Sequence, residues 1–184
     1  MAFPEGPAGG GVKYAASKLL AHRATLDWMA QNKPHFALIT LHPSFVVGHD
    51  RTQVSAATPG ATMNSWVLGS LASGTPVMPG QLVDVRDVSA AHVASIDAPL
   101  DPNVPLTEVQ LTGPTMNWEA VAKVVKAKYP SIPCKMTEEG PYPAPFVGDS
   151  TRAEREFGIK WHSVEETISS LLDQQLGFRE RAGL

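Results

Sequence analysis

The stretch FALITL, residues 36–41, is a short apolar run that lies between Pro34 and the turn sequence HPS at 42–44. Apolar side chains occupy both faces of this run. A strand with one face in water would show a cleaner alternation of apolar and polar residues. The sequence therefore predicts a buried strand of a parallel sheet, and such a sheet needs helices to cover its faces.

Helical and strand-like segments alternate along the rest of the chain, which is typical of an α/β fold. Loops are predicted where proline and glycine cluster. The predicted helices are 14–31, 62–73, 87–98, 117–129 and 164–176; the further predicted strands are 81–85, 108–112 and 134–137; the predicted loops are 1–12 and 42–61.

Several polar residues are expected to begin or end these helices. Asp87 should cap the helix that follows it, because its carboxylate can accept a hydrogen bond from a free backbone N–H group. Asn117 or Thr115 should cap the next helix. Two pairs of residues have capping-box spacing, Thr151 with Glu154 and Ser163 with Glu166. Gly177 is expected to stop the last helix.

Composition limits the class of protein. The 184 residues are 43% hydrophobic and 18% charged, with a net charge of −3 and no basic cluster, so nucleic acid is not an expected partner. No apolar stretch reaches the roughly 18–20 residues of a membrane span. The single cysteine, Cys134, cannot form an internal disulfide and is expected to be a packed thiol. A reducing compartment, the cytoplasm, is the simplest expectation.

Tyr14 and Lys18 lie four residues apart in the first predicted helix, so both side chains should share one face. A free tyrosine gives up its proton only in alkaline solution, and a nearby ammonium group stabilises the phenolate. The pair could therefore do proton chemistry. A chance pairing of two ordinary helix residues is the alternative, since Tyr-x-x-x-Lys alone is a weak signal.

Four segments together resemble the extended branch of the short-chain dehydrogenase/reductases, which holds nucleotide-sugar epimerases, dihydroflavonol and cinnamoyl-CoA reductases, and fungal aldehyde and ketone reductases. The resemblance covers nearly the whole chain. The segments are KYAASK at 13–18, LHPSFVVGH at 41–49, VDVRDVSAAHV at 83–93 and FVGDSTRAEREFGIKWHSVEETI at 146–168.

The resemblance implies the C-terminal part of a Rossmann-like, doubly wound parallel sheet with a small substrate-binding subdomain. Residues 1–184 would form a single truncated domain. Within it, 1–100 would be the remainder of the Rossmann-like core with the catalytic helix, and 101–184 mostly the substrate-side subdomain. The glycines at 6 and 9–11 have no strand before them, so the usual glycine-rich phosphate turn and the dinucleotide-binding half are expected to be missing.

The resemblance also implies residue roles. Tyr14 would donate a proton to a carbonyl as hydride arrives from the nicotinamide, and Lys18 would hold the nicotinamide ribose and assist the tyrosine. The cofactor is expected to be NADP(H) rather than NAD(H). Residues beside the nicotinamide would be Pro43, Ser44, Phe45 and Val46, and residues shaping the substrate pocket would be Thr62, Met63 and Trp66.

Three functions stay open at this point. The first is an NADP(H)-dependent reductase of a small carbonyl compound, as in fungal secondary metabolism. The second is a non-catalytic remnant or accessory half-domain that needs a complementing chain. The third is a cofactor-free isomerase or lyase that uses Tyr14. With the first half missing, a sheet edge and one helix face should be open, so a homo-oligomer or a partner chain is expected to cover them.

Other polar residues have simpler interpretations. His42 and His49 flank the turn after the first predicted strand but lack a third ligand at suitable spacing, so no metal site is predicted. Asp84, Arg86 and Asp87 are expected to form a cap and ion pair at a strand–helix junction rather than an acid–base site.

Overall fold

The computed structural model describes residues 6–55, 62–78, 80–98, 104, 106–114, 117–144 and 147–183, with side chains described from residue 9 onward. The chain divides into two compact units. Unit 1 comprises 1–40 and 100–108, and unit 2 comprises 41–99 and 109–184. Each unit is described by itself.

Unit 1 is dominated by the long helix α1, Gly6–Asn32. The prediction of a loop over 1–12 is wrong for 6–12, which are helical. A proline is tolerated in the first helical turn, because the backbone N–H groups there have no acceptor within the helix. Glycine in a helix interior costs only about 1 kcal/mol relative to alanine, which weakens a helix without ending it.

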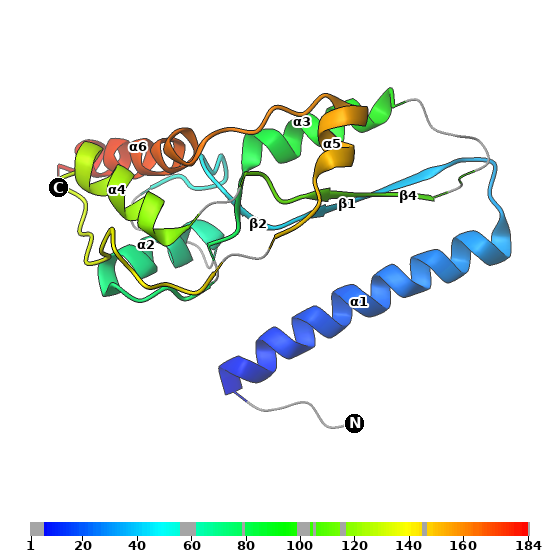
Figure 1. The fold of residues 1–184 in the computed structure, drawn as a ribbon, viewed down its shortest axis with the longest axis horizontal. Helices are drawn as coiled ribbons and strands as arrows, with labels where there is room; N and C mark the ends of the chain where they lie inside the picture. Colours follow the sequence, from blue (N-terminus) through cyan, green and yellow to red (C-terminus); the bar gives the residue numbers. More distant parts are fainter. Residues whose placement is uncertain are drawn as a thin grey trace. The chain divides into compact units, whose positions relative to one another are not determined.

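Two paired strands pass from unit 1 into unit 2. β1, Leu38–Pro43, and β4, Leu106–Leu111, form a two-stranded sheet and run in the same direction (Figure 1). The two predicted strands, 36–41 and 108–112, are thus confirmed with bounds shifted by one or two residues. β1 is half-buried rather than fully buried.

A second two-stranded sheet lies in unit 2. β2, Phe45–Val47, pairs in parallel with β3, Leu82–Asp84, with Phe45 opposite Leu82 and Val47 opposite Asp84. The prediction of a loop over 42–61 is wrong at 42–43, where β1 ends, and at β2, since a strand of three residues is too short to show a period. Residues 56–61 lie outside the described residues. The strand predicted at 81–85 is confirmed.

The core of unit 2 lies among three helices, α2 (Met63–Ser73), α4 (Trp118–Lys128) and α6 (Val164–Ala182). Figure 1 shows α4 and α6 side by side. Their inward side chains are almost completely inaccessible to water, which is the main source of stability for this unit. The largest of them are Leu71 of α2, Trp118 of α4, and Ile168, Leu171 and Leu172 of α6.

The last helix continues past its predicted end. Gly177 lies inside α6, and Gly183, in a left-handed conformation, caps its end instead. Phe178 is buried directly after Gly177, so packing extends the helix through a residue that usually stops one. The capping box predicted for Ser163 and Glu166 is confirmed at the start of α6.

The remaining predictions met mixed outcomes. Asn117 caps α4 as expected, while Thr115 lies outside the described residues. α5, Thr151–Phe157, begins after Ser150, whose side chain makes no cap bond, so the capping box predicted for Thr151 and Glu154 is wrong. The Asp149 carboxylate accepts from the Thr151 N–H instead. Residues 134–137 form no strand; the Lys135 N–H instead donates to the backbone oxygen of Leu71 on α2.

Helix α3, Val85–Ile96, follows β3 directly and packs against α5. Its N-cap is Asp84 and not Asp87, because α3 begins directly at the end of β3, three residues earlier than predicted. The α/β class predicted from the sequence is confirmed. Among the described helices, none has the length and apolar character needed to cross a membrane.

Candidate active site

Tyr14 and Lys18 lie in unit 1 on one face of α1. The Nζ atom of Lys18 is 5.5 Å from the centre of the Tyr14 ring, which is the proximity that their four-residue spacing predicts. Tyr14 is 66% exposed, and its hydroxyl is therefore open to another molecule. The pair provides a proton donor with a cation beside it.

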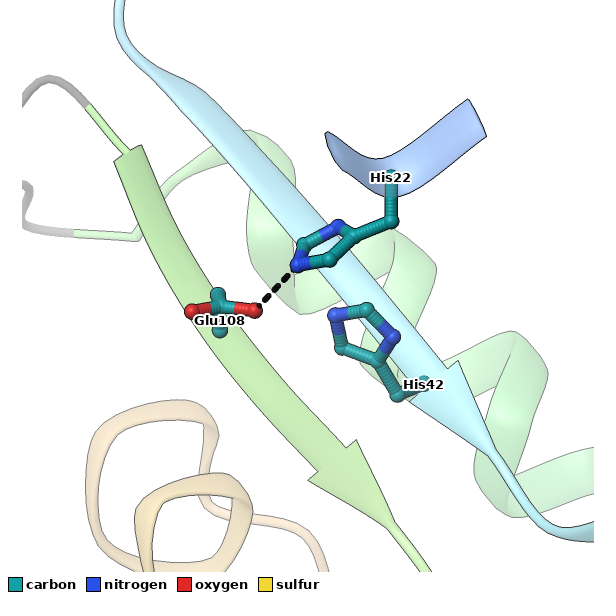
Figure 2. Close-up of side chains that lie close together, drawn as sticks. All are labelled: His22, His42 and Glu108. Atoms are coloured by element: carbon teal, nitrogen blue, oxygen red, sulfur yellow. Dashed lines mark ion pairs between the residues drawn. The ribbon is translucent and has the colours of Figure 1, made fainter. Parts of the chain in front are cut away.

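A histidine one turn further along α1 makes an ion pair within unit 1. Figure 2 shows His22 pointing toward Glu108 of β4, with 2.8 Å between the histidine Nε2 and the glutamate Oε1. This contact fixes α1 to the first part of β4. His42, also drawn in Figure 2, belongs to unit 2.

Unit 2 contains a cavity of about 790 Å³ beyond the carboxyl ends of β2 and β3. Ligands of parallel α/β sheets commonly bind at this end of the strands, and the volume suits a small organic molecule. The wall combines valines with polar groups. Its residues are Val46, Val47, Gly48, His49, Asp50, Arg51, Thr52, Thr62, Met63, Asn64, Val85, Arg86 and Ser89.

Three of the predicted site residues in unit 2 line this cavity. Val46 lies at its β2 side, while Thr62 and Met63 lie where α2 begins. Pro43, Ser44, Phe45 and Trp66 are not among the lining residues. The backbone N–H groups of Ser44 and Phe45 instead donate to Leu111 and Gln81, which joins the end of β1 to β4 and the start of β2 to β3.

The turn that leaves β2 depends on Gly48. Its φ angle of +127° is strained for residues with a side chain, and a Cβ atom there would lie 3.1 Å from a methyl carbon of Val85. Buried Asn64 of α2 accepts from the Gly48 N–H and donates to the Gly48 carbonyl. The amide thus satisfies both backbone groups of the turn residue on the cavity wall.

Arg86 and Asp84 form a bidentate ion pair beside the cavity. The arginine Nε and Nη2 donate to the two carboxylate oxygens over 2.9 and 2.7 Å, and Asp84 is buried. Burial alone would raise the pKa of Asp84, but the hydrogen bonds and the charge of Arg86 outweigh burial and hold that pKa below its usual range. The predicted cap and ion pair exist, with Asp84 as the cap.

Asp87 has a different partner. Its buried carboxylate accepts from the backbone N–H of His162 over 3.0 Å and contacts the His162 ring. Asp87 therefore connects α3 to the segment before α6, which is a structural role.

No protein-family model matches the sequence. Among curated proteins, a ketoreductase, sphI, of Aspergillus fumigatus is 33% identical over 172 residues, which cover 90% of this chain and 49% of that protein. Aldehyde reductase 2 of Sporidiobolus salmonicolor is 27% identical over 171 residues, 88% of this chain and 48% of that protein. The chain is thus similar to fungal ketoreductases over most of its own length. It spans about half the length of these curated relatives.

The fold agrees with that relationship. The crystal structure of a yeast methylglyoxal/isovaleraldehyde reductase, Gre2, complexed with NADPH superposes with a TM-score of 0.69 at 21% identity, over 91% of this chain and 52% of that one. The chain has the fold of roughly the C-terminal half of a Rossmann-like short-chain dehydrogenase/reductase. The resemblance seen in the sequence is confirmed.

Sequence reasoning missed two polar residues of α6 that hydrogen-bond to the cavity wall in unit 2. Ser170 and Gln174 accept from the backbone N–H groups of His49 and Asp50. The signal in the sequence is weak: Gln174 and Gln175 are polar residues within the mostly apolar inner face of α6. Their partners lie more than 120 residues away and follow no short spacing.

Proposed function

We propose that this chain carries the proton-donating part of an NADP(H)-dependent reductase of small ketones or aldehydes. The observation that carries the proposal is that Tyr14 and Lys18 share one face of a helix in a relative of the ketoreductases. The cavity at the carboxyl ends of β2 and β3 supports it, because it offers a small-molecule site with apolar and polar walls.

In this mechanism the hydroxyl of Tyr14 donates a proton to the carbonyl oxygen of the substrate. The ammonium group of Lys18 stabilises the phenolate that the transfer leaves behind. Lys18 also binds the ribose hydroxyls of the cofactor, as the resemblance implies. Bound NADPH supplies the hydride. Tyr14 and Lys18 are exposed, so the α1 surface is open to a dinucleotide.

The residues present fit only one end of that cofactor. By the resemblance, Tyr14 and Lys18 of unit 1 would hold the nicotinamide and its ribose. Gly9, Gly10 and Gly11 lie within α1 and not in a turn between a strand and a helix, so they do not form a phosphate loop. NADP(H) rather than NAD(H) is supported by the NADPH complex of the yeast reductase.

Substrate binding is assigned to the cavity in unit 2. Val46, Val47 and Val85 give it an apolar side, whereas Thr62 and Asn64 give it polar groups. A compound with a carbonyl and a short apolar chain suits such a wall. Methylglyoxal and isovaleraldehyde, named for the yeast reductase, are suitable first probes.

The proposal is tested by calorimetric titration of the folded chain with NADPH and with NADH, followed by an assay of NADPH oxidation in the presence of methylglyoxal. We expect micromolar NADPH binding that is lost in Lys18→Ala. Tyr14→Phe should keep the binding and lower the rate about 10²–10⁴-fold. Absence of binding to a folded sample would contradict a reductase made by this chain alone.

A second candidate function is an accessory half that acts with a separate chain carrying the dinucleotide-binding half. The large apolar side chains exposed on α1, which include Leu19 and Leu20, favour it. Sedimentation analysis distinguishes the two candidates: a stable monomer that binds NADPH supports the first. A chain that binds NADPH only after addition of the N-terminal half of a ketoreductase supports the second.

A further inference from the structure

We propose that Gln174 of α6 is a positioning residue for the substrate cavity, because it fixes the backbone of the cavity wall without lining the cavity. This inference rests on the proposed function, since it names a residue that shapes the substrate site of that function. It depends on hydrogen bonds within unit 2 alone.

The cavity wall at 48–50 is held by side chains from helices. Gly48 is bound by Asn64 of α2. The N–H of His49 donates to the Ser170 hydroxyl over 3.1 Å, and the N–H of Asp50 donates to the Gln174 Oε1 over 2.9 Å. These three residues follow β2 directly and leave the sheet, so side chains replace the neighbouring strand that would otherwise bind their backbone.

Gln174 makes the most complete of the contacts from α6. Its Nε2 also donates to the Asp50 carbonyl over 2.6 Å, so one amide group satisfies both backbone groups of Asp50. The Asp50 carboxylate is engaged elsewhere, since it accepts from the N–H and the hydroxyl of Thr52. Gln174 is only 8% exposed, so water cannot easily replace it.

Asp50 and its neighbours line the cavity, whereas Gln174 does not. Loss of the amide should let the wall adopt other shapes and reduce the fraction of molecules whose cavity is ready to bind. Apparent affinity falls in proportion to that fraction. The Michaelis constant for the carbonyl substrate should therefore rise, while the rate of the bound complex should change little.

The adjacent residue offers a matched control. Gln175 is also 8% exposed, and it also makes two hydrogen bonds, both to the amide of Gln53. Gln53 does not line the cavity. Gln174→Leu and Gln175→Leu thus each remove two hydrogen bonds from the same helix, and only the first removes bonds made directly to a residue that lines the cavity. Gln53 contacts that residue through its backbone N–H, which donates to the Asp50 carbonyl and which both variants keep.

The experiment measures the melting temperature of both variants and their steady-state kinetics with methylglyoxal and NADPH. We expect similar losses of melting temperature, with a KM for methylglyoxal about tenfold higher in Gln174→Leu only and with kcat nearly unchanged. Gln174→Glu keeps the acceptor for the Asp50 N–H but sets a carboxylate oxygen against the Asp50 carbonyl, so it should also raise KM. Equal KM values in the two leucine variants, or an unchanged KM in Gln174→Leu, would overturn the proposal.

A second measurement separates this inference from the proposed function. If the wild-type chain neither binds NADPH nor reduces methylglyoxal, the proposed function fails, and hydrogen exchange at the backbone amides of His49 and Asp50 decides the positioning role. Faster exchange in Gln174→Leu than in wild type and Gln175→Leu supports it. Equal exchange in all three overturns it. If Gln174→Leu does not fold, Gln174→Glu takes its place in both measurements.

Discussion

The two longest helices of this chain, α1 and α6, have opposite relations to their surroundings. α6 has 19 residues, and its apolar side chains Ile168, Leu171 and Leu172 are completely buried. α1 has 27 residues, yet Leu19 and Leu20 are 68% and 64% exposed. Similar leucines therefore have different energetic roles in the two helices.

The difference shows where each helix obtains its stability. α6 buries an apolar face against α4 and β2 and begins with a complete capping box. α1 lacks such a face, and the described part of the chain covers little of it apart from Met29. A helix whose apolar residues stay in water gains little from tertiary packing, and packing usually provides most of helix stability.

The largest effect is expected for a core leucine of α6. Leu171→Ala removes a completely buried side chain and leaves a cavity, so the free energy of unfolding should fall by about 2–5 kcal/mol. Urea denaturation followed by circular dichroism measures the loss. A change below about 1 kcal/mol would mean that α6 is not the packed helix described above.

A smaller effect is expected at the ion pair that connects β3 to the start of α6. Asp84 binds Arg86, and the Arg86 Nη2 also donates to the Glu166 carbonyl. Because the folded-state pKa of Asp84 lies below its usual 3.8, its stabilisation is present above pH 3.8 and is lost as the pH falls through the folded-state value. Asp84→Asn should cost about 1–3 kcal/mol at neutral pH.

The acid dependence provides the check on that ion pair. Thermal melts between pH 7 and pH 2 should show a steeper loss of stability for wild type than for Asp84→Asn. Parallel curves for the two proteins would contradict the assignment of this carboxylate.

The capping box of α6 should have an effect of moderate size. Ser163→Ala removes the hydroxyl that accepts from the Glu166 N–H, so the free energy of unfolding should fall by about 0.5–2 kcal/mol. Thermal denaturation measures it. Ser150→Ala is a comparison at the start of α5, because the Ser150 hydroxyl makes no hydrogen bond that caps this helix. Ser150 instead bonds Thr112, so its loss should affect the end of β4 and not the start of α5.

The smallest effect is expected on α1. Leu20→Ala removes an exposed side chain and should change the free energy of unfolding by less than about 0.5 kcal/mol. Leu171→Ala in α6 is expected to lower the free energy of unfolding several times more than Leu20→Ala does. Measuring both variants compares a buried with an exposed leucine directly. A loss above 1 kcal/mol in a concentration-dependent melt would show that another molecule covers α1, as the accessory-half hypothesis requires.

Much of the fold was predictable because its signals are local. The periodic segments at α2 and α4, the cap at Asn117 and the box at Ser163 depend on residues within one or two turns of each other. The proximity of Tyr14 and Lys18 on α1 follows from helix geometry for the same reason. Their catalytic role stays a prediction.

The errors arose where tertiary contacts override local preference. Gly177 does not end α6 because Phe178 packs into the core, and β2 exists because β3 lies beside it. Asp84 rather than Asp87 caps α3 because β3 ends there. None of these outcomes is visible in a window of a few residues.

The sequence by itself determined the α/β class, most of the helices, the Tyr14–Lys18 pair and the relationship to ketoreductases, since each depends on short-range pattern or on a quoted motif. Only the tertiary structure decided the cavity beyond β2 and β3 and its connection to Gln174. That connection joins residues 124 positions apart in the chain. Hydrogen bonds of this kind follow from how helices pack on a sheet, and packing leaves no periodic trace in the sequence.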